Sequence, residues 1–403
     1  LRSGGRSKDD RHWLLFKERD NEAKSIDDGD ILEEKPNSVA SKKTLEQIGK
    51  SKRVWHSNRS ENGKHQTDDD APQAKLKTMK AASPATRTSK KTAKKAIIPY
   101  DAQKQLFAGV RLTSPDKVLY PHCEVTKLEL ANYYASVADW LLPHIADRPI
   151  VLVRCPEGQT GECFFQKHPG AGTPDNLRRV PIKEKSGTED YVVVDDKEGL
   201  ISLAQIGSLE IHAWGSRTDK LEKPDRLIFD LDPDPAVPWS TVVASARSIR
   251  EFLVELELES FLKTTGGKGL HLVVPIDRKH DWDEVKAFCK EVAEVIVAAD
   301  PKHYVSNMSK AARTGKIFID YLRNGRGSTA VAPYSPRSKV NAPVSVPVAW
   351  EELSTKLHSD QFTIRNIMDR LKKLKKDPWA KIDSMKQSLT PALQTLKRLG
   401  TAK

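Results

Sequence analysis

One stretch of eight residues, Arg226-Leu-Ile-Phe-Asp-Leu-Asp-Pro233, constrains the fold of this chain more than any other part of the sequence. Its apolar and acidic residues alternate as in a β-strand, where every second side chain points to the same face. Asp230 and Asp232 should therefore share one face, and Pro233, which cannot donate a backbone hydrogen bond, should mark the strand end. Two neighbouring carboxylates are costly to bury alone, and a divalent cation with oxygen ligands relieves that cost.

A second strand pattern, Lys316-Ile-Phe-Ile-Asp-Tyr-Leu322, carries a third acidic residue, Asp320, near its end. Three carboxylates at the ends of two strands favour a site for two Mg²⁺ or Mn²⁺ ions that catalyses in-line displacement at phosphorus. The alternative is that the acids are solvated at exposed strand ends, because an isolated Asp-x-Asp motif often matches by chance.

The sequence around these strands alternates between helix and strand patterns. Apolar residues recur at helical spacing over residues 240–256 and 282–296, with a strand pattern at 270–275 between them. Ser240 is expected to cap the first of these helices. This order predicts an α+β fold, namely a palm with an RNA-recognition-like antiparallel or mixed sheet and helices packed on it.

Further elements are expected upstream of this core. Thr126 and Glu129 form a capping-box pattern that begins a helix, and Pro143 should end it. Strand patterns follow at residues 149–154, 163–168, 191–194, 200–203 and 208–213.

Charge and cysteine usage limit the class of protein. Residues 1–100 contain 23 Lys and Arg against 15 Asp and Glu, which is most of the net charge of +12. Residues 61–100 are predicted to be a flexible, disordered basic linker, which either holds nucleic acid or simply keeps the chain solvated. No apolar run reaches the ~20 residues of a membrane helix. The four cysteines form no Cys-x-x-Cys pair and are expected to be buried, reduced thiols of a cytosolic protein.

A glycine-rich segment, Thr264-Thr-Gly-Gly-Lys-Gly-Leu-His271, lies between the two acidic strands. Glycines allow backbone N–H groups to approach a phosphate closely, while Lys268 adds a positive charge and Thr265 a hydroxyl. The segment is therefore either a cradle for a nucleoside triphosphate or a tight turn, and Lys268 and His271 favour the cradle. Nearby basic residues also suit phosphate recognition, namely Lys310, Arg313, Lys316 and Arg337.

Two adjacent aromatic residues, Phe164 and Phe165, admit two interpretations. On a strand one of them would face the core, whereas on a loop both could stack on bases at ~1–3 kcal/mol per base. His212 lies in a strand pattern and, taken alone, is more typical of a structural histidine than of a ligand.

These residues together resemble a known family. The segment from Leu112 to about Leu393 is similar to the polymerase domain of bacterial ATP-dependent DNA ligase D, which belongs to the archaeo-eukaryotic primase superfamily and serves non-homologous end joining. Six motifs in the family's order carry the resemblance: Leu112-Thr-Ser-Pro-Asp-Lys-Val-Leu-Tyr-Pro121, Phe164-Phe-Gln-Lys-His168, Phe229-Asp-Leu-Asp-Pro233, Thr265-Gly-Gly-Lys-Gly-Leu-His271, Phe318-Ile-Asp320 and Ala332-Pro-Tyr-Ser335.

The resemblance implies a role for each motif. Asp230, Asp232 and Asp320 resemble the catalytic triad that binds two Mn²⁺ or Mg²⁺ ions. The implied contacts to the incoming nucleoside triphosphate are His212, Thr265, Lys268, His271, Arg313 and Arg337. The implied DNA contacts are Lys117 and Lys127, which would hold a 5′-phosphate, and Phe164 and Phe165, which would stack on template bases. Arg323 stands where some members have Gln and is left without a role.

The resemblance also implies a domain order and partners. Residues 1–60 resemble the end of the family's 3′-phosphoesterase module, followed by the linker at 61–100, the polymerase domain at 101–360 and a helical C-terminal extension at 361–403. No ligase module is visible, so nick sealing is not expected. The implied partners are double-stranded DNA ends and gaps with a 5′-phosphate, and the Ku protein. The chain is expected to act as a monomer in the bacterial cytoplasm, at the nucleoid and away from membranes.

The sequence therefore predicts a template-dependent DNA/RNA nucleotidyltransferase that fills gaps and extends ends, with ribonucleotides preferred. One alternative is a non-catalytic fragment that binds DNA ends. The other is a nucleotide-sugar glycosyltransferase, which also uses Asp-x-Asp with Mn²⁺ but would explain neither Asp320 nor the basic and aromatic residues.

Overall fold

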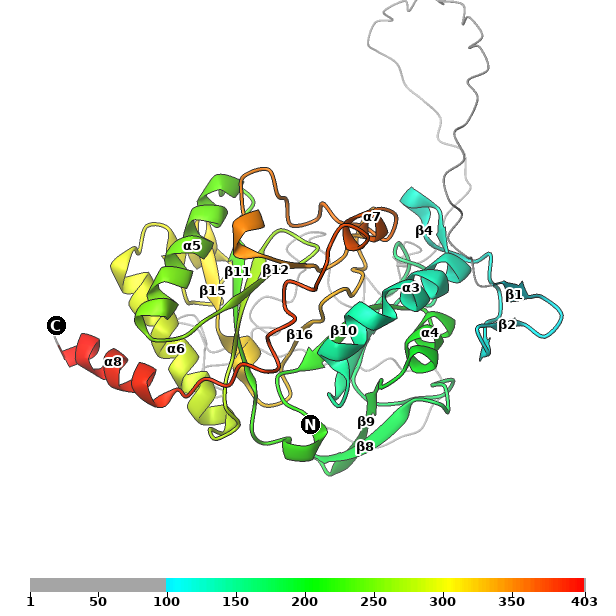
Figure 1. The fold of residues 1–403 in the computed structure, drawn as a ribbon, viewed down its shortest axis with the longest axis horizontal. Coiled ribbons are helices and arrows are strands. Elements are labelled where there is room, and N and C mark those ends of the chain that lie inside the picture. The colour runs from blue at the N-terminus through cyan, green and yellow to red at the C-terminus, as the bar shows by residue number, and fades with distance from the viewer. Residues whose placement is uncertain (1–98, 402–403) are drawn as a thin grey trace, which may run out of the picture. The chain divides into compact units, whose positions relative to one another are not determined.

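Two six-stranded sheets organise the part of the chain that the structure describes, residues 99–401 (Figure 1). The structure is a computed structural model. The expected phosphoesterase remnant at 1–60 and nearly all of the basic linker at 61–100 lie outside the described residues.

The first sheet is built around β6, which pairs antiparallel with three other strands. In spatial order its strands are β16 (Thr329–Val331), β10 (Ser208–Trp214), β6 (Ile150–Arg154), β9 (Thr188–Val193) and β8 (Arg178–Lys183), with β7 (Phe164–Gln166) also paired to β6.

The second sheet contains both acidic strands and is antiparallel apart from one parallel pair, β14 with β15. In spatial order its strands are β14 (Tyr304–Val305), β15 (Ile317–Asp320), β11 (Arg226–Pro233), β13 (Leu270–Pro275), β12 (Phe261–Thr264) and β17 (Pro347–Val348). An antiparallel sheet and a mixed sheet with packed helices confirm the predicted α+β class.

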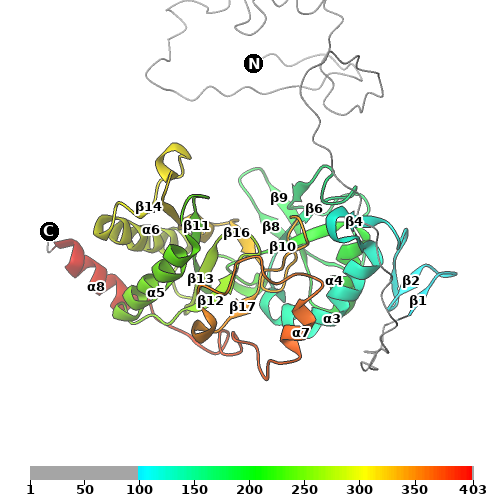
Figure 2. The same ribbon diagram turned by 90° about the horizontal axis from the view of Figure 1, so that it is seen from above.

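The helices divide between the two sheets, with α3 and α4 beside the first and α5 and α6 beside the second (Figure 2). No helix within residues 99–401 is long and apolar enough to cross a membrane. The helix bounds are α3 (Lys127–Ile145), α4 (Lys197–Gln205), α5 (Trp239–Glu255), α6 (Trp282–Ala299), α7 (Ile367–Leu371) and α8 (Thr390–Thr401).

The main hydrophobic core explains which face of β11 is left for chemistry. Leu227, Phe229 and Leu231 are fully buried in one cluster with apolar residues of α5 and α6. Because side chains alternate along a strand, Asp230 and Asp232 lie on the opposite face. Helices α5 and α6 therefore cover the apolar face, and the acidic face is turned toward the first sheet and the loops.

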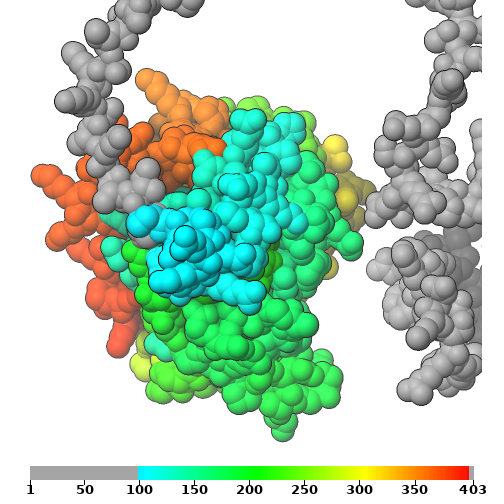
Figure 3. All heavy atoms as spheres, turned by 90° about the vertical axis from the view of Figure 1, so that its right-hand side faces the viewer, coloured from blue at the N-terminus to red at the C-terminus, as the bar shows by residue number. Residues whose placement is uncertain are grey.

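Short elements complete the described chain. The first residues form a three-stranded sheet of β1 (Tyr100–Asp101), β2 (Leu106–Phe107) and β3 (Val110–Arg111), and a hairpin of β4 (Val118–Tyr120) and β5 (Val125–Thr126). In Figure 3 this cyan segment lies beside orange residues from much later in the chain. Arg365 joins them, because its guanidinium pairs with Glu129 and donates to the carbonyl of Cys123.

Three local predictions are wrong, each for a physical reason. Residues 200–203 form part of helix α4 instead of a strand, since Asp196 caps this helix and its apolar residues are buried with helical spacing. Helix α3 continues past Pro143 to Ile145, because a proline in the last turn breaks only one hydrogen bond. Helix α5 begins one residue before Ser240, and its N-cap is Pro238.

Candidate active site

Four neighbouring strands of the second sheet bring charged residues into one row. Asp230 on β11 lies opposite Asp320 on β15, and on its other side it lies opposite His271 on β13. His271 in turn lies opposite Lys263 on β12. Residues directly opposed on antiparallel strands share a face, and Asp232, two residues beyond Asp230, shares it too. The structure thus brings all three predicted carboxylates to one face of the sheet.

Each of the three carboxylates has a cationic partner. Nε of Arg323 lies 3.2 Å from Oδ2 of Asp320 and 3.5 Å from Oδ2 of Asp230. Asp232 pairs with Nζ of Lys268 at 3.1 Å and with Nη1 of Arg313 at 3.2 Å. Arg323, which sequence analysis left without a role, therefore lies between two of the acids. Within residues 99–401, no three His, Cys, Asp or Glu side chains converge closely enough to hold a metal ion.

Burial and charge shift the protonation of this row in different directions. Burial alone would raise the pKa of Asp230, but its contact with His271 and the charge of Arg323 outweigh burial and lower it. For Asp320 burial prevails, and the pKa lies above its usual value. Burial, helped by the charge of Lys263, lowers the pKa of His271 to about 4. His271 is therefore neutral at pH 7 and can serve Asp230 as a hydrogen-bond donor.

The three carboxylates of this row, Asp230, Asp232 and Asp320, are called the acidic row below. A pocket opens beside the acidic row, between the two sheets. It collects most of the predicted nucleotide contacts and adds Lys339, which sequence analysis missed although it follows Arg337 by two residues. The lining residues are His212, Asp230, Asp232, Thr265, Gly267, Lys268, Gly269, His271, Arg323, Ala330, Val331, Arg337 and Lys339. Arg313 and Asp320 are not among the lining residues but contact Asp232 and Arg323, which are.

The glycine-rich segment is a tight turn that also borders the pocket. The Thr265 hydroxyl donates to the carbonyl of Gly269 at 3.0 Å and accepts from the backbone N–H of Gly267 at 3.2 Å. A Cβ at Gly269 would lie 2.1 Å from the carbonyl oxygen of Leu231, so only glycine allows β11 and this turn to approach so closely. The two interpretations of the segment are compatible, since the turn presents Lys268 to the pocket.

His212 is held by a carboxylate that sequence analysis did not single out. Oε2 of Glu210 lies 2.8 Å from Nε2 of His212 and accepts from Nε of Arg337 at 2.9 Å. Both Glu210 and His212 point to the same face of β10, and this i, i+2 spacing was visible in the sequence.

The predicted pair of lysines meets at the base of the β4–β5 hairpin. The backbone N–H of Lys127 donates to the carbonyl of Lys117 at 2.8 Å. Burial and the charge of Lys117 lower the pKa of Lys127, which is the first residue of α3. A cation is unfavourable at a helix N-terminus, whereas an anion is favoured there. Two amines beside the N–H groups of this helix end therefore suit a phosphate.

The two phenylalanines of β7 are both exposed, 41% for Phe164 and 68% for Phe165. Of the two interpretations, the one in which a phenylalanine faces the core is therefore wrong, although both residues do lie on a strand. Arg154 lies over the ring of Phe164. The rings of Phe165 and His212 meet edge-on, with their centroids 5.7 Å apart. Exposed rings beside the pocket are available to stack on bases.

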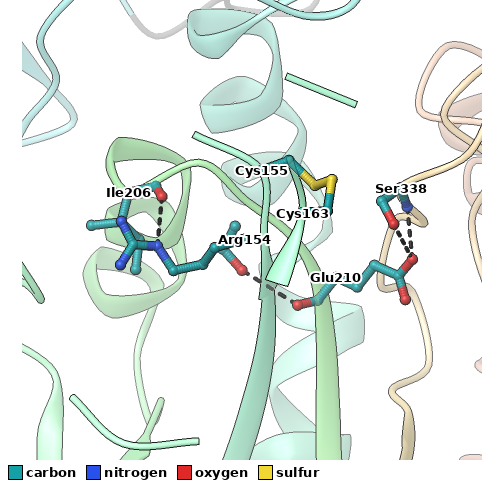
Figure 4. The surroundings of a disulfide bond; sticks show 7 residues. Arg154, Cys155, Cys163, Ile206, Glu210 and Ser338 are labelled. Atoms are coloured by element: carbon teal, nitrogen blue, oxygen red, sulfur yellow. Dashed lines mark hydrogen bonds between the residues drawn. A yellow bond between two sulfur atoms is a disulfide. The ribbon is translucent and has the colours of Figure 1, made fainter. Parts of the chain in front are cut away.

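A disulfide joins Cys155 and Cys163 immediately before Phe164 (Figure 4). This corrects the prediction that all four cysteines are reduced; Cys123 and Cys289 are free thiols. The bond ties β7 to the end of β6, where Arg154 donates through Nε to the carbonyl of Ile206.

Comparison with known proteins gives one consistent result. The family described as LigD, primase-polymerase domain matches residues 126–379, more than half of the chain. The multifunctional non-homologous end joining protein LigD of Pseudomonas aeruginosa is 40% identical over 294 residues, which cover 73% of this chain and 35% of that protein. The LigD protein of Mycolicibacterium smegmatis is 38% identical over 250 residues, which cover 62% of this chain and 33% of that protein. The chain thus spans about a third of the length of these relatives.

A solved structure is similar in fold as well as in sequence. The polymerase domain from Mycobacterium tuberculosis ligase D, in complex with DNA, superimposes with a TM-score of 0.64 at 34% identity. The match covers 68% of this chain and 98% of that domain.

Proposed function

Because this chain belongs to the family of LigD primase-polymerase domains, we propose that it is a template-dependent nucleotidyltransferase that fills gaps and extends ends in bacterial non-homologous end joining. One observation carries the proposal: the acidic row on β11 and β15 adjoins a pocket with Lys268, Arg323 and Arg337 on its walls. Carboxylates beside a basic pocket suit transfer of a nucleotide from a triphosphate.

The acidic row fits divalent cations by the chemistry of its donors. Asp230, Asp232 and Asp320 offer the hard oxygen ligands that Mn²⁺ and Mg²⁺ prefer, and these residues would hold the two ions. Bound there, the ions would lower the pKa of a primer 3′-hydroxyl and neutralise the leaving pyrophosphate. Because Arg323 pairs with both Asp230 and Asp320, we propose that its guanidinium withdraws when these carboxylates take a cation.

The other pocket residues would bind and orient the nucleoside triphosphate. Lys268 and Arg313, which pair with Asp232, can turn to phosphate oxygens, and Arg337 is placed for a third phosphate contact. The roles expected for His212, Thr265 and His271 remain proposals, supported by their position on the pocket wall.

DNA would be held at two places. Lys117 and Lys127 would bind the 5′-phosphate of the downstream strand, and Phe164 and Phe165 would stack on template bases. DNA binding is supported by the similarity to a ligase D polymerase domain solved with DNA. We also propose that the chain works as a monomer in the bacterial cytoplasm with the Ku protein as partner, and that ribonucleotides are preferred.

For the domain order, we propose a polymerase domain at residues 101–360 and its C-terminal extension at 361–403, after a segment similar to the phosphoesterase module at 1–60 and a linker at 61–100. Trp379 supports the extension as part of the same unit, because it is buried against Ile228 and Val273 of the second sheet.

Primer extension on a gapped duplex with Mn²⁺ tests the proposal. Asp230→Asn keeps the size of the side chain but removes a carboxylate from the row, so it should abolish nucleotide addition while DNA binding persists. Asp219→Asn is the matched control, because Asp219 also pairs with an arginine, Arg278, but lies outside the pocket. Full activity of Asp230→Asn would remove the acidic row from the mechanism.

The same assay separates the alternatives. A non-catalytic protein that binds DNA ends would retain the gapped duplex without releasing pyrophosphate. A glycosyltransferase would hydrolyse or transfer a nucleotide sugar without a template, and the family match favours the nucleotidyltransferase.

A further inference from the structure

Glu210 is a buried carboxylate that the proposed reaction does not use directly. It is 4% exposed and is not among the residues that line the pocket. Its two oxygens nevertheless contact four donor groups. Oε2 is bonded to His212 and Arg337, at 2.8 and 2.9 Å. Oε1 accepts from the backbone N–H and the hydroxyl of Ser338, at 2.8 and 2.7 Å (Figure 4).

We propose that Glu210 is a positioning residue for the nucleotide pocket, which orients His212 and Arg337 toward the triphosphate without contacting it. The proposal rests on the proposed function, since it assigns the two residues to nucleotide binding. Its basis is geometric: a single carboxylate oxygen holds two side chains that both reach the pocket wall.

The contacts of Arg337 show why this arrangement needs a fixed anchor. Nη1 of Arg337 donates to the carbonyl of Thr265, in the glycine-rich turn of the second sheet. Glu210 belongs to β10 of the first sheet. Arg337 therefore links one wall of the pocket to the other, and the carboxylate fixes the guanidinium from the side of the first sheet.

Protonation supports this role. Burial alone would raise the pKa of Glu210, but the hydrogen bond with His212 and the charge of Arg337 outweigh it, so the carboxylate is ionised at neutral pH. An ionised carboxylate accepts hydrogen bonds only, so it fixes a proton on Nε2 of His212. Burial keeps the pKa of His212 below its usual value, which leaves Nδ1 of the neutral ring as an acceptor.

The test measures steady-state primer extension by the full chain with ATP and Mn²⁺ on a gapped duplex. Glu210→Gln should raise KM for ATP roughly tenfold, because charge-assisted hydrogen bonds to His212 and Arg337 are lost. The kcat at saturating ATP and the affinity for DNA should change little. Glu210→Asp keeps the charge and should therefore raise KM for ATP less than Glu210→Gln does.

A cycle of combined variants separates positioning from general stability. If Glu210 acts through His212 and Arg337, then adding Glu210→Gln to a chain that already carries His212→Ala and Arg337→Ala should raise KM little further. An undiminished effect of Glu210→Gln in that background would overturn the proposal. Glu352→Gln is the matched control, because Glu352 is also paired with an arginine, Arg370, but lies away from the pocket.

A second variant keeps the test decisive if Glu210→Gln does not fold. Ser338→Ala removes one donor from Glu210 while leaving His212 and Arg337 intact, so it should raise KM for ATP severalfold with an unchanged melting temperature. An unchanged KM in Glu210→Gln, or in Ser338→Ala where Glu210→Gln does not fold, would overturn the positioning role alone. Absence of nucleotide addition by the wild-type chain would instead overturn the proposed function, and this inference with it.

Discussion

Arg323 offers the sharpest test of how the acidic row is balanced. Its guanidinium lies 3.2 Å from Asp320 and 3.5 Å from Asp230, and those two carboxylates lie opposite each other on neighbouring strands. Replacing Arg323 by alanine leaves the two acids facing each other without this counter-charge. We expect the folded chain to lose stability and to regain it when a divalent cation supplies the missing charge.

The size of the effect follows from distance and exposure. At about 3.3 Å, Coulomb's law with an effective dielectric constant of about 20 gives roughly 5 kcal/mol per pair as an upper bound. The Arg323 side chain is 43% exposed, so solvent screening reduces the contribution of each ion pair to stability to about 1 kcal/mol. Two pairs contribute about 2 kcal/mol, which corresponds to a melting temperature about 4 °C lower in a domain of this size.

The assay is thermal unfolding at neutral pH, with and without MnCl₂. Arg323→Ala should melt below wild type without metal, and added Mn²⁺ should raise its melting temperature more than that of wild type. Arg179→Ala is the matched control, since Arg179 is similarly exposed at 45% and pairs with Asp175 away from the pocket. Equal melting temperatures of Arg323→Ala and wild type, or an equal response to Mn²⁺, would refute the reasoning.

Three further predictions follow from other contacts. Lys117→Ala with Lys127→Ala should weaken binding to a gap with a 5′-phosphate about tenfold or more, because charge-assisted contacts to the phosphate are lost; equal losses on phosphorylated and unphosphorylated gaps, measured by fluorescence anisotropy, would contradict the assigned role. Asp225 is a partly buried partner of the fully buried Arg148. Burial alone would raise the pKa of Asp225, but the charge of Arg148 outweighs burial and lowers this pKa to about 2. Since the folded pKa of Asp225 lies below its unfolded value, this carboxylate should add about 2 kcal/mol to the free energy of unfolding above pH 4, and this contribution should be lost as pH falls through about 2. The free energies of unfolding of Asp225→Asn and wild type, measured with urea, should therefore differ at neutral pH and converge at low pH. Cys163→Ser, or reduction of wild type by dithiothreitol, should lower the free energy of unfolding by roughly 2.5 kcal/mol through the freed loop between Cys155 and Cys163; identical unfolding curves for the oxidised and reduced wild type would show that the disulfide adds no stability.

Local patterns predicted the elements that depend on neighbours in the chain. The alternation around Asp230 gave a strand with both acids on one face, and the capping box at Thr126 and Glu129 gave the start of α3. The short apolar run at 200–203 was misassigned, because such a run fits a buried strand and a buried helix equally well. Its helical form is decided by Asp196, whose side chain satisfies the N–H of Gly199.

The sequence by itself determined the acidic strands, the glycine-rich turn and the family, because these depend on residue type and short spacing. Only the tertiary structure decided that Glu210 holds Arg337, 127 residues further along the chain, and that Arg323 lies between Asp230 and Asp320. It likewise decided that Cys155 and Cys163 form a disulfide and that both phenylalanines of β7 are exposed. Such partnerships depend on how two sheets pack and on strand register, and no periodicity within one segment encodes them.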